Sequence, residues 1–194
     1  MINQNEKLII LGKTIINHSN NECELSFLTE CVKFVKGSEV GSKNYVEIYE
    51  KGLIRYLRVG DLIQLGNTFV ENKENYPMAT AEDILIAFDG APGRNAFGIE
   101  GVYSSGIYKA FCESKYKGLV YFELNSDLNM KIISDHSQGT TILHASKAIQ
   151  HLKYAKVNID TLNKLNIIFN QLLSNKKKIK NLQIVKSNLL SKYF

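Results

Sequence analysis

The 194-residue sequence has few cysteines, few prolines and no tryptophan. Its three cysteines, Cys23, Cys31 and Cys112, are scattered and form no CxxC pair, which argues against a disulfide framework and against a zinc finger. Two prolines are too few for a proline-rich linker or a collagen-like repeat. The N-terminus lacks the layout of a cleavable signal, and no apolar run approaches the roughly 20 residues that span a bilayer. We therefore expect a soluble, cytoplasmic protein without a membrane partner.

Most motifs that carry chemistry are missing as well. The LGKT at Leu11–Thr14 lacks the upstream glycine of a phosphate-binding loop. The four histidines have no metal-binding spacing, and neither GxSxG nor GxGxxG occurs. None of these motifs therefore supplies a catalytic residue, a metal site or a cofactor-binding site.

Positive charge is concentrated at one end of the chain. The formal net charge is +5, but the segment from Asp160 onward holds seven lysines and one acid, a net of +6. Residues 1–159 therefore carry a net charge of −1. A basic protein often binds nucleic acid or an anionic membrane. Because the body of this protein is close to neutral, charge alone does not make it a DNA-binding protein.

The first 157 residues read as short strands separated by many turns. Twelve of the 13 glycines lie between residues 37 and 139, which is typical of a strongly bent sheet. Short helices are expected over Leu28–Val35 and His144–Leu152, and residues 1–25 remain unassigned. Runs of β-branched or aromatic residues predict strands within 46–50, 53–60, 83–90, 118–125 and 130–134.

From residue 158 onward the pattern predicts one long helix. Asp160 is a suitable N-cap, and no glycine or proline follows it. Asn175 and Lys186 occupy seam positions, which weakens packing but can fix register and partner. The helix either packs on its own domain or protrudes and pairs with another chain. Its apolar residues alternate at three and four positions, the seam of a coiled coil: Leu165, Ile168, Leu172, Ile179, Leu182 and Leu189.

Three blocks follow one another in a fixed order, Phe34–Leu62, Ala81–Phe111 and Ser137–Val157. The first contains LIRYLRVGDL after a glycine-to-tyrosine turn, the second EDILIAFDGAPGR, and the third GTTILH before a short helix. This order resembles the target recognition domain of type I restriction–modification specificity subunits, with "yirv-x-Dl", "gDiLia-x-dG-x-x-Gr" and "GTT-x-x-h" ahead of a conserved helix. The resemblance covers nearly the whole chain after about Thr29. The family's proline-rich segment and glutamine before that helix have no counterpart here.

The resemblance implies an α+β fold in two parts. A bent, mostly antiparallel β-sheet recognition domain with short helices would occupy residues 1–157, and a long C-terminal coiled-coil helix for dimerisation and spacing would occupy 158–194. A standard specificity subunit resembles two such units in tandem, so this chain resembles a half-subunit.

The same resemblance implies a DNA-binding protein that catalyses nothing itself. Two half-subunits would form a homodimer through the C-terminal helix and read a bipartite inverted repeat in double-stranded DNA. A methyltransferase subunit would supply S-adenosylmethionine, and a restriction and translocase subunit would supply ATP-driven cleavage.

Candidate DNA contacts follow from the chemistry of side chains in the three blocks. Arginine and lysine suit guanine, asparagine and glutamine suit adenine, and hydroxyls hold phosphates. Arginine is scarce, with three against 21 lysines. Arg55 and Arg58 lie three apart on one strand and face opposite sides, so at most one is expected to reach DNA. The candidates are Lys36, Ser42, Lys43, Tyr45, Arg58, Arg94, Asn95, Gln138, Thr140 and Thr141.

Two other functions remain open. Magnesium-dependent nucleases of the PD-(D/E)xK type place an Asp ahead of a D/E-x-K triplet. Asp89 with Glu113–Lys115, or Asp61 with Glu71–Lys73, fits that pattern, although roughly two such triplets are expected by chance in so charged a chain. The third possibility is an interaction protein that mimics a specificity subunit and interferes with its assembly.

Overall fold

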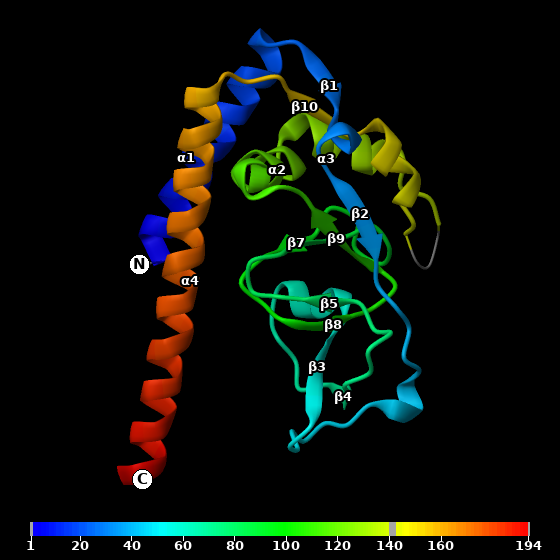
Figure 1. The fold of residues 1–194 in the computed structure, drawn as a ribbon, viewed down its shortest axis with the longest axis vertical. Helices are drawn as coiled ribbons and strands as arrows, with labels where there is room; N and C mark the ends of the chain where they lie inside the picture. Colours follow the sequence, from blue (N-terminus) through cyan, green and yellow to red (C-terminus); the bar gives the residue numbers. More distant parts are fainter. Residues whose placement is uncertain (1, 140–142, 194) are drawn as a thin grey trace.

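The computed structural model describes residues 2–139 and 143–193. A long helix, α4 (Ile159–Tyr193), runs down one side of a β-rich body (Figure 1). Helix α1 (Ile2–Glu22) lies beside the first half of α4, and α2 (Lys117–Leu124) and α3 (Asp127–Asp135) lie at the same end of the body. The fold is therefore α+β, with antiparallel sheets and a long C-terminal helix, as expected.

Ten short strands form three sheets within the described residues. The smallest pairs β1 (Leu25–Phe27) with β10 (Lys153–Ala155). The middle sheet is antiparallel throughout, in the order β2 (Lys33–Lys36), β9 (Ile107–Phe111), β6 (Ile84–Ala87) and β7 (Asn95–Ala96). The distal sheet has one parallel pair, β3–β8, in the order β4 (Phe69–Glu71), β3 (Leu53–Leu57), β8 (Gly101–Tyr103) and β5 (Met78–Ala79).

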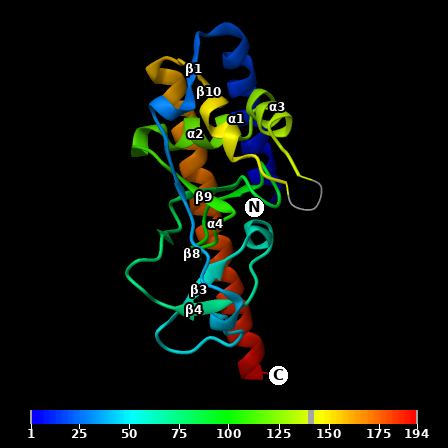
Figure 2. The same ribbon diagram turned by 90° about the vertical axis from the view of Figure 1, so that its right-hand side faces the viewer.

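Strand β6 shows how the layers are stacked. Ile84 and Ile86 pack into the large core that the helices share, whereas Leu85 and Ala87 pack into a smaller core towards the distal sheet. Successive side chains of a strand point to opposite faces, so a strand buried on both faces is apolar throughout. The middle sheet therefore lies between the helices and the distal sheet (Figure 2).

The strands predicted at 118–125 and 130–134 are wrong, because these residues form α2 and α3. Seven of the eight residues of α2 are buried, so its apolar run carries no helical period. Helix α3 starts where the Ser126 hydroxyl accepts a hydrogen bond from the Asn129 amide at 3.2 Å.

The remaining local predictions have mixed outcomes. The strands at 53–60 and 83–90 are confirmed as β3 and β6. Residues 46–50 form no regular strand; Val46 alone bridges to β4. The unassigned N-terminus forms α1 and the start of β1.

Single turns of 3₁₀ helix join several of these elements. The helix expected over 28–35 is the 3₁₀ turn η1 followed by strand β2, whereas the short helix expected over 144–152 is confirmed as η5. The turns are η1 (Leu28–Glu30), η2 (Ser42–Asn44), η3 (Val59–Leu62), η4 (Ser114–Tyr116) and η5 (Ser146–His151).

The first half of α4 belongs to the core of its own chain. Its N-terminal cap is Asn158 rather than Asp160, since the Asn158 side chain accepts a hydrogen bond from the Thr161 amide at 2.9 Å. The first three residues of the predicted seam do not form a contact between chains. They are buried within their own chain and are therefore unavailable to a partner. These are Leu165, Ile168 and Leu172, which are 0%, 7% and 1% exposed.

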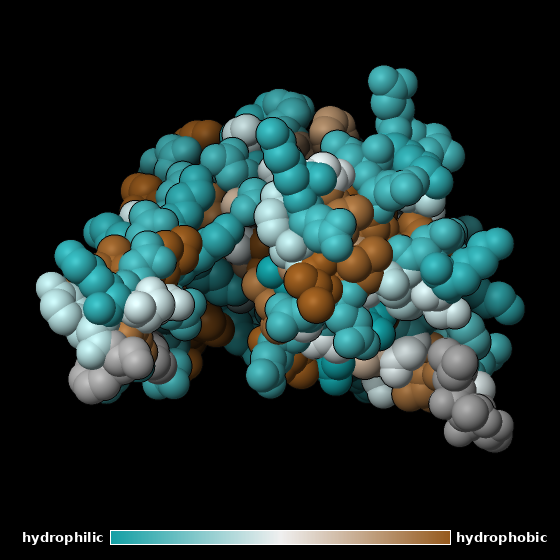
Figure 3. All heavy atoms as spheres, turned by 90° about the horizontal axis from the view of Figure 1, so that it is seen from below, coloured by the Kyte–Doolittle hydropathy of each residue, from teal (hydrophilic) through white to brown (hydrophobic). Residues whose placement is uncertain are grey.

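The second half of α4 leaves the body after Lys180. The Lys176 ammonium donates to the Phe97 carbonyl at 2.9 Å, and Lys180 pairs with Glu100 at 2.8 Å. Beyond this point Leu182 and Leu189 are 56% and 52% exposed. Seen from the distal end, apolar side chains are open to solvent both along α4 and over the β domain (Figure 3). None of the described helices is both long and apolar enough to cross a membrane.

Candidate nucleic-acid interface

The turn that follows β6 gathers side chains from three distant parts of the chain. The Asp89 carboxylate hydrogen-bonds to the His144 ring at 2.9 Å, and the Lys36 ammonium lies 3.8 Å from its other oxygen. His144 in turn exchanges two backbone hydrogen bonds, of 3.0 and 2.8 Å, with Gln138. Two predicted contacts, Lys36 and Gln138, are thus brought to one edge around the Asp89 carboxylate.

A second feature is the loop of residues 59–66, which we call the arginine loop. Arg94 donates to the carbonyl of Val59 at 3.4 Å, at one end of the loop, and Arg55 donates to the carbonyl of Gly66, at the other end. Arg58 immediately precedes the loop. All three arginines of the chain therefore meet at one short segment.

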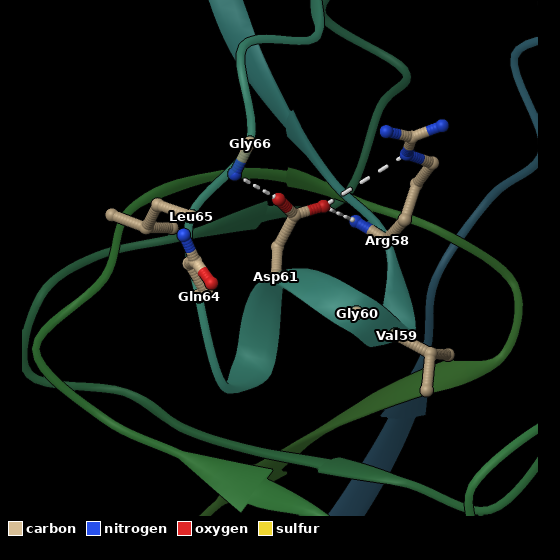
Figure 4. Close-up of a pocket in the computed structure, with 7 residues that line it drawn as sticks. All are labelled: Arg58, Val59, Gly60, Asp61, Gln64, Leu65 and Gly66. Carbon is tan, nitrogen blue, oxygen red and sulfur yellow. Dashed lines mark hydrogen bonds and ion pairs between the residues drawn. The ribbon is translucent and has the colours of Figure 1, made fainter.

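Asp61 holds the arginine loop closed. Its carboxylate is 5% exposed and accepts hydrogen bonds from the backbone amides of Arg58, at 2.7 Å, and of Gly66 (Figure 4). The Arg58 guanidinium Nε lies 3.9 Å from the same carboxylate. A Cβ at Gly66 would lie only 2.9 Å from Asp61 Oδ1, so a side chain there would displace the carboxylate.

An open hollow of about 650 Å³ lies against the arginine loop. In Figure 4, Asp61 stands between Arg58 on one side and Gln64 and Leu65 on the other. Gln64 is exposed, and the apolar side chains beside it, Ile63 and Leu65, are 73% and 46% exposed. The hollow therefore combines cationic, amide and apolar groups, and Asp61 is the acid among its lining residues.

The predicted contacts Ser42, Lys43 and Tyr45 lie in and directly after the 3₁₀ turn η2. Ser42 and Lys43 are exposed in η2, and the Tyr45 ring packs 5.2 Å from that of Tyr56. The Tyr45 hydroxyl donates to Glu39 at 3.3 Å, and partial burial raises the pKa of that hydroxyl. Ser42 and Lys43 can still reach a phosphate, whereas Tyr45 is held within the turn.

Three predicted contacts, Asn95, Thr140 and Thr141, differ from the others. The Asn95 side chain forms a reciprocal amide pair with Asn125, at 3.1 and 3.2 Å, and also donates to the Gly93 carbonyl at 3.0 Å. Its polar atoms are therefore engaged inside the chain. Thr140 and Thr141 lie outside the described residues.

The residues of the nuclease hypothesis do not assemble into a metal site. Asp89 is engaged by His144 and Lys36, while Glu113 and Lys115 pair with each other at 3.0 Å on the surface. Among residues 2–139 and 143–193, no group of three or more His, Cys, Asp or Glu side chains could hold a metal ion.

Comparison with known proteins identifies the fold. No protein-family model and no curated protein sequence matches the chain. Solved structures do match: the type I restriction–modification S subunit from M. genitalium has a TM-score of 0.63 and 19% identity, over 100% of this chain and 55% of that one. The HsdS subunit from Thermoanaerobacter tengcongensis has a TM-score of 0.60 and 12% identity, over 94% of this chain and 47% of that one.

This is the fold of type I specificity subunits. A further chain, from a structure of a type I restriction–modification system solved to explain its assembly and conformational transition, matches at TM-score 0.60 and 12% identity, over 98% of this chain and 50% of that one. The resemblance stated from the sequence is thus confirmed at the level of fold. The chain spans about half the length of the specificity-subunit structures that it matches.

His144 and Gln64 belong to this candidate surface but were not among the predicted contacts. His144 is the last residue of the GTTILH block, so its place in the block was an available signal. Nothing in the sequence pointed to Gln64, because its position depends on how Asp61 folds the loop back on itself.

Proposed function

We propose that the chain is the sequence-specific DNA recognition component of a type I restriction–modification complex and acts as a half-subunit. The observation that carries this proposal is the match of the whole chain to about half of each S-subunit structure. One recognition domain with one long helix is then the repeating unit, and two copies supply what a full-length subunit holds in one chain.

The surface around Asp89 supports DNA binding. Lys36, Arg58 and Arg94 offer cationic groups, and Gln138 offers an exposed amide, all near the turns that join the middle and distal sheets. Cationic and hydroxyl groups bind phosphates and fix the register on the duplex, while amide and guanidinium groups read base edges. The chain supplies recognition only; the methyltransferase and restriction subunits bring S-adenosylmethionine, ATP and the chemistry.

The distal half of α4 supports pairing of two copies. Leu182, Val185 and Leu189 lie on one side of the helix and are each about half exposed. An antiparallel pair centred near Val185 places Leu182 of one copy beside Leu189 of the other, so one stripe serves both chains. Such a self-complementary contact closes as a two-fold dimer, and a two-fold dimer reads an inverted repeat.

The test of recognition is selection from a randomised DNA duplex pool at moderate salt, with and without a methyltransferase subunit. An inverted repeat with a fixed spacer is the expected product. Recovery of nothing above background in both selections would refute sequence recognition and favour the assembly-interfering mimic. Mg²⁺-dependent cutting by the purified chain that is lost in Asp89→Asn would instead favour the nuclease.

The test of pairing is sedimentation of the full chain and of the double variant Leu182→Glu, Leu189→Glu. Both side chains are exposed, so the variant should fold, and it should sediment as a monomer. Ile167→Glu is the matched control, because Ile167 is 69% exposed on the half of α4 that packs on its own body. A double variant that still sediments as a dimer would show that α4 is not the contact.

A further inference from the structure

A loop that is only exposed to solvent does not need arginines to hold its two ends. Arg55 and Arg94 donate to carbonyls at the two ends of the arginine loop, and the Arg55 guanidinium also lies 4.9 Å over the Phe69 ring. A chain with 21 lysines thus places its three planar, permanently charged groups on one segment. These hydrogen bonds tie both ends of the loop to the body, and cationic groups lie at its base.

The tip of the loop is exposed, although both of its ends are held by arginines. Ile63 is 73% exposed and Leu65 is 46% exposed, on either side of the exposed Gln64. Within the described part of the chain, the Gln64 carboxamide has no hydrogen-bond partner. The charge of the buried Asp61 carboxylate is offset at the tip by the Arg58 guanidinium, whose Nε lies 3.9 Å from it.

We propose that the tip Ile63–Leu65 enters the major groove of DNA and that Gln64 reads an A·T base pair there. This inference rests on the proposed function and names the element that performs it. A glutamine carboxamide has one donor and one acceptor at the spacing of adenine N7 and N6, and apolar side chains contact the thymine methyl group. Arg58, beside the tip, binds the adjacent phosphate and sets the depth of entry.

The chemistry of the tip favours DNA over a protein partner. The core of a protein–protein interface is enriched in aromatic side chains, whereas here two aliphatic residues flank an amide without a partner, above a base that carries arginines. That arrangement matches the major groove of DNA. There, thymine methyl groups, base edges that hydrogen-bond with an amide, and phosphates lie next to one another.

The experiment measures binding of the wild-type chain and Gln64→Ala to the selected target and to every single base-pair substitution of it. Gln64→Ala should bind the target about tenfold more weakly and lose discrimination at one A·T pair in each half-site. Binding to unrelated DNA and the thermal unfolding midpoint should not change. Arg58→Ala should weaken binding to all sequences alike and reduce the salt slope by about one. Gln4→Ala, an exposed glutamine on α1, is the matched control.

The outcomes separate this inference from the function on which it rests. A wild-type chain that selects a target, with a Gln64→Ala profile identical at every position, would overturn the assignment of the loop and leave the proposed function standing. A wild-type chain that selects nothing would overturn both. If Gln64→Ala keeps its base preferences but no longer assembles with the methyltransferase subunit, the loop docks a protein and the assignment is wrong.

Discussion

Replacing Glu123 by glutamine should remove a pH dependence from the stability of this fold. Glu123 lies in α2 and is 0% exposed. One carboxylate oxygen accepts a hydrogen bond from the Ala155 amide at 2.8 Å, and the other accepts one from the Asn20 side chain at 3.1 Å. The carboxyl group therefore joins α1, α2 and β10. Burial raises its pKa from 4.5 to about 7, although the hydrogen bonds partly oppose that shift.

The sign and size of the effect follow from this pKa. Because the folded-state pKa lies above the unfolded one, the stabilisation is fully present below pH 4.5 and is lost as the pH rises to about 7. At about 1.4 kcal/mol per pKa unit, the wild-type chain loses about 3 kcal/mol over this interval. A glutamine still accepts from the Ala155 amide. Its Nε2 can donate to Asn20 Oδ1, which has no partner among the described residues, once the Asn20 amide turns.

The assay is urea unfolding followed by circular dichroism at fixed protein concentration, from pH 4.5 to 8. The free energy of unfolding of Glu123→Gln, minus that of the wild type, should rise by about 3 kcal/mol across the range. Glu22→Gln, at an exposed position at the end of α1, controls for the loss of one negative charge. A difference that stays constant with pH would refute the reasoning, because the buried carboxyl would then ionise as freely in the folded chain as in the unfolded one.

Two further predictions concern packing and thiol chemistry. Gly118→Ala should cost more than about 2 kcal/mol in urea unfolding, because its Cβ would lie 2.4 Å from the backbone of α4, whereas Gly60→Ala, with open space around it, should change stability little. Burial raises the pKa of Cys31 to about 12 and of Cys112 to about 11, so iodoacetamide at pH 8 should label both slowly until urea is added. Equal labelling rates in the native and unfolded chains would contradict the second prediction.

The long helix shows what periodicity can and cannot predict. The spacing of Leu165, Ile168 and Leu172 correctly marks one buried face of a helix. The same spacing describes a helix packed on its own domain and a helix paired with another chain, since both bury a stripe. Only the fold decides between them, and it divides the seam: the first half is internal, and Leu182 and Leu189 remain a prediction of pairing.

Helices α1 and α2 could not be predicted from the sequence, for two different physical reasons. Helix α2 is buried on every side, so its apolar run resembles a central strand. Helix α1 lies ahead of the three blocks on which the resemblance rests, so they gave it no assignment, and it packs against α4 and α2. Strand β6 was predictable because it too is apolar throughout, and there the short run between turns favoured the correct assignment.

The arginine loop could not be predicted from the sequence, because two hydrogen bonds to one buried side chain close it. Strand alternation places Arg55 and Arg58 on opposite faces, and for an extended chain only one of them would reach a ligand. The alternation ends with β3 at Leu57, and the buried Asp61 then ties the amide of Arg58 to that of Gly66. The chain folds back, and both arginines meet the same eight residues from different sides. One buried carboxylate thus brings together two arginines that strand alternation alone would separate.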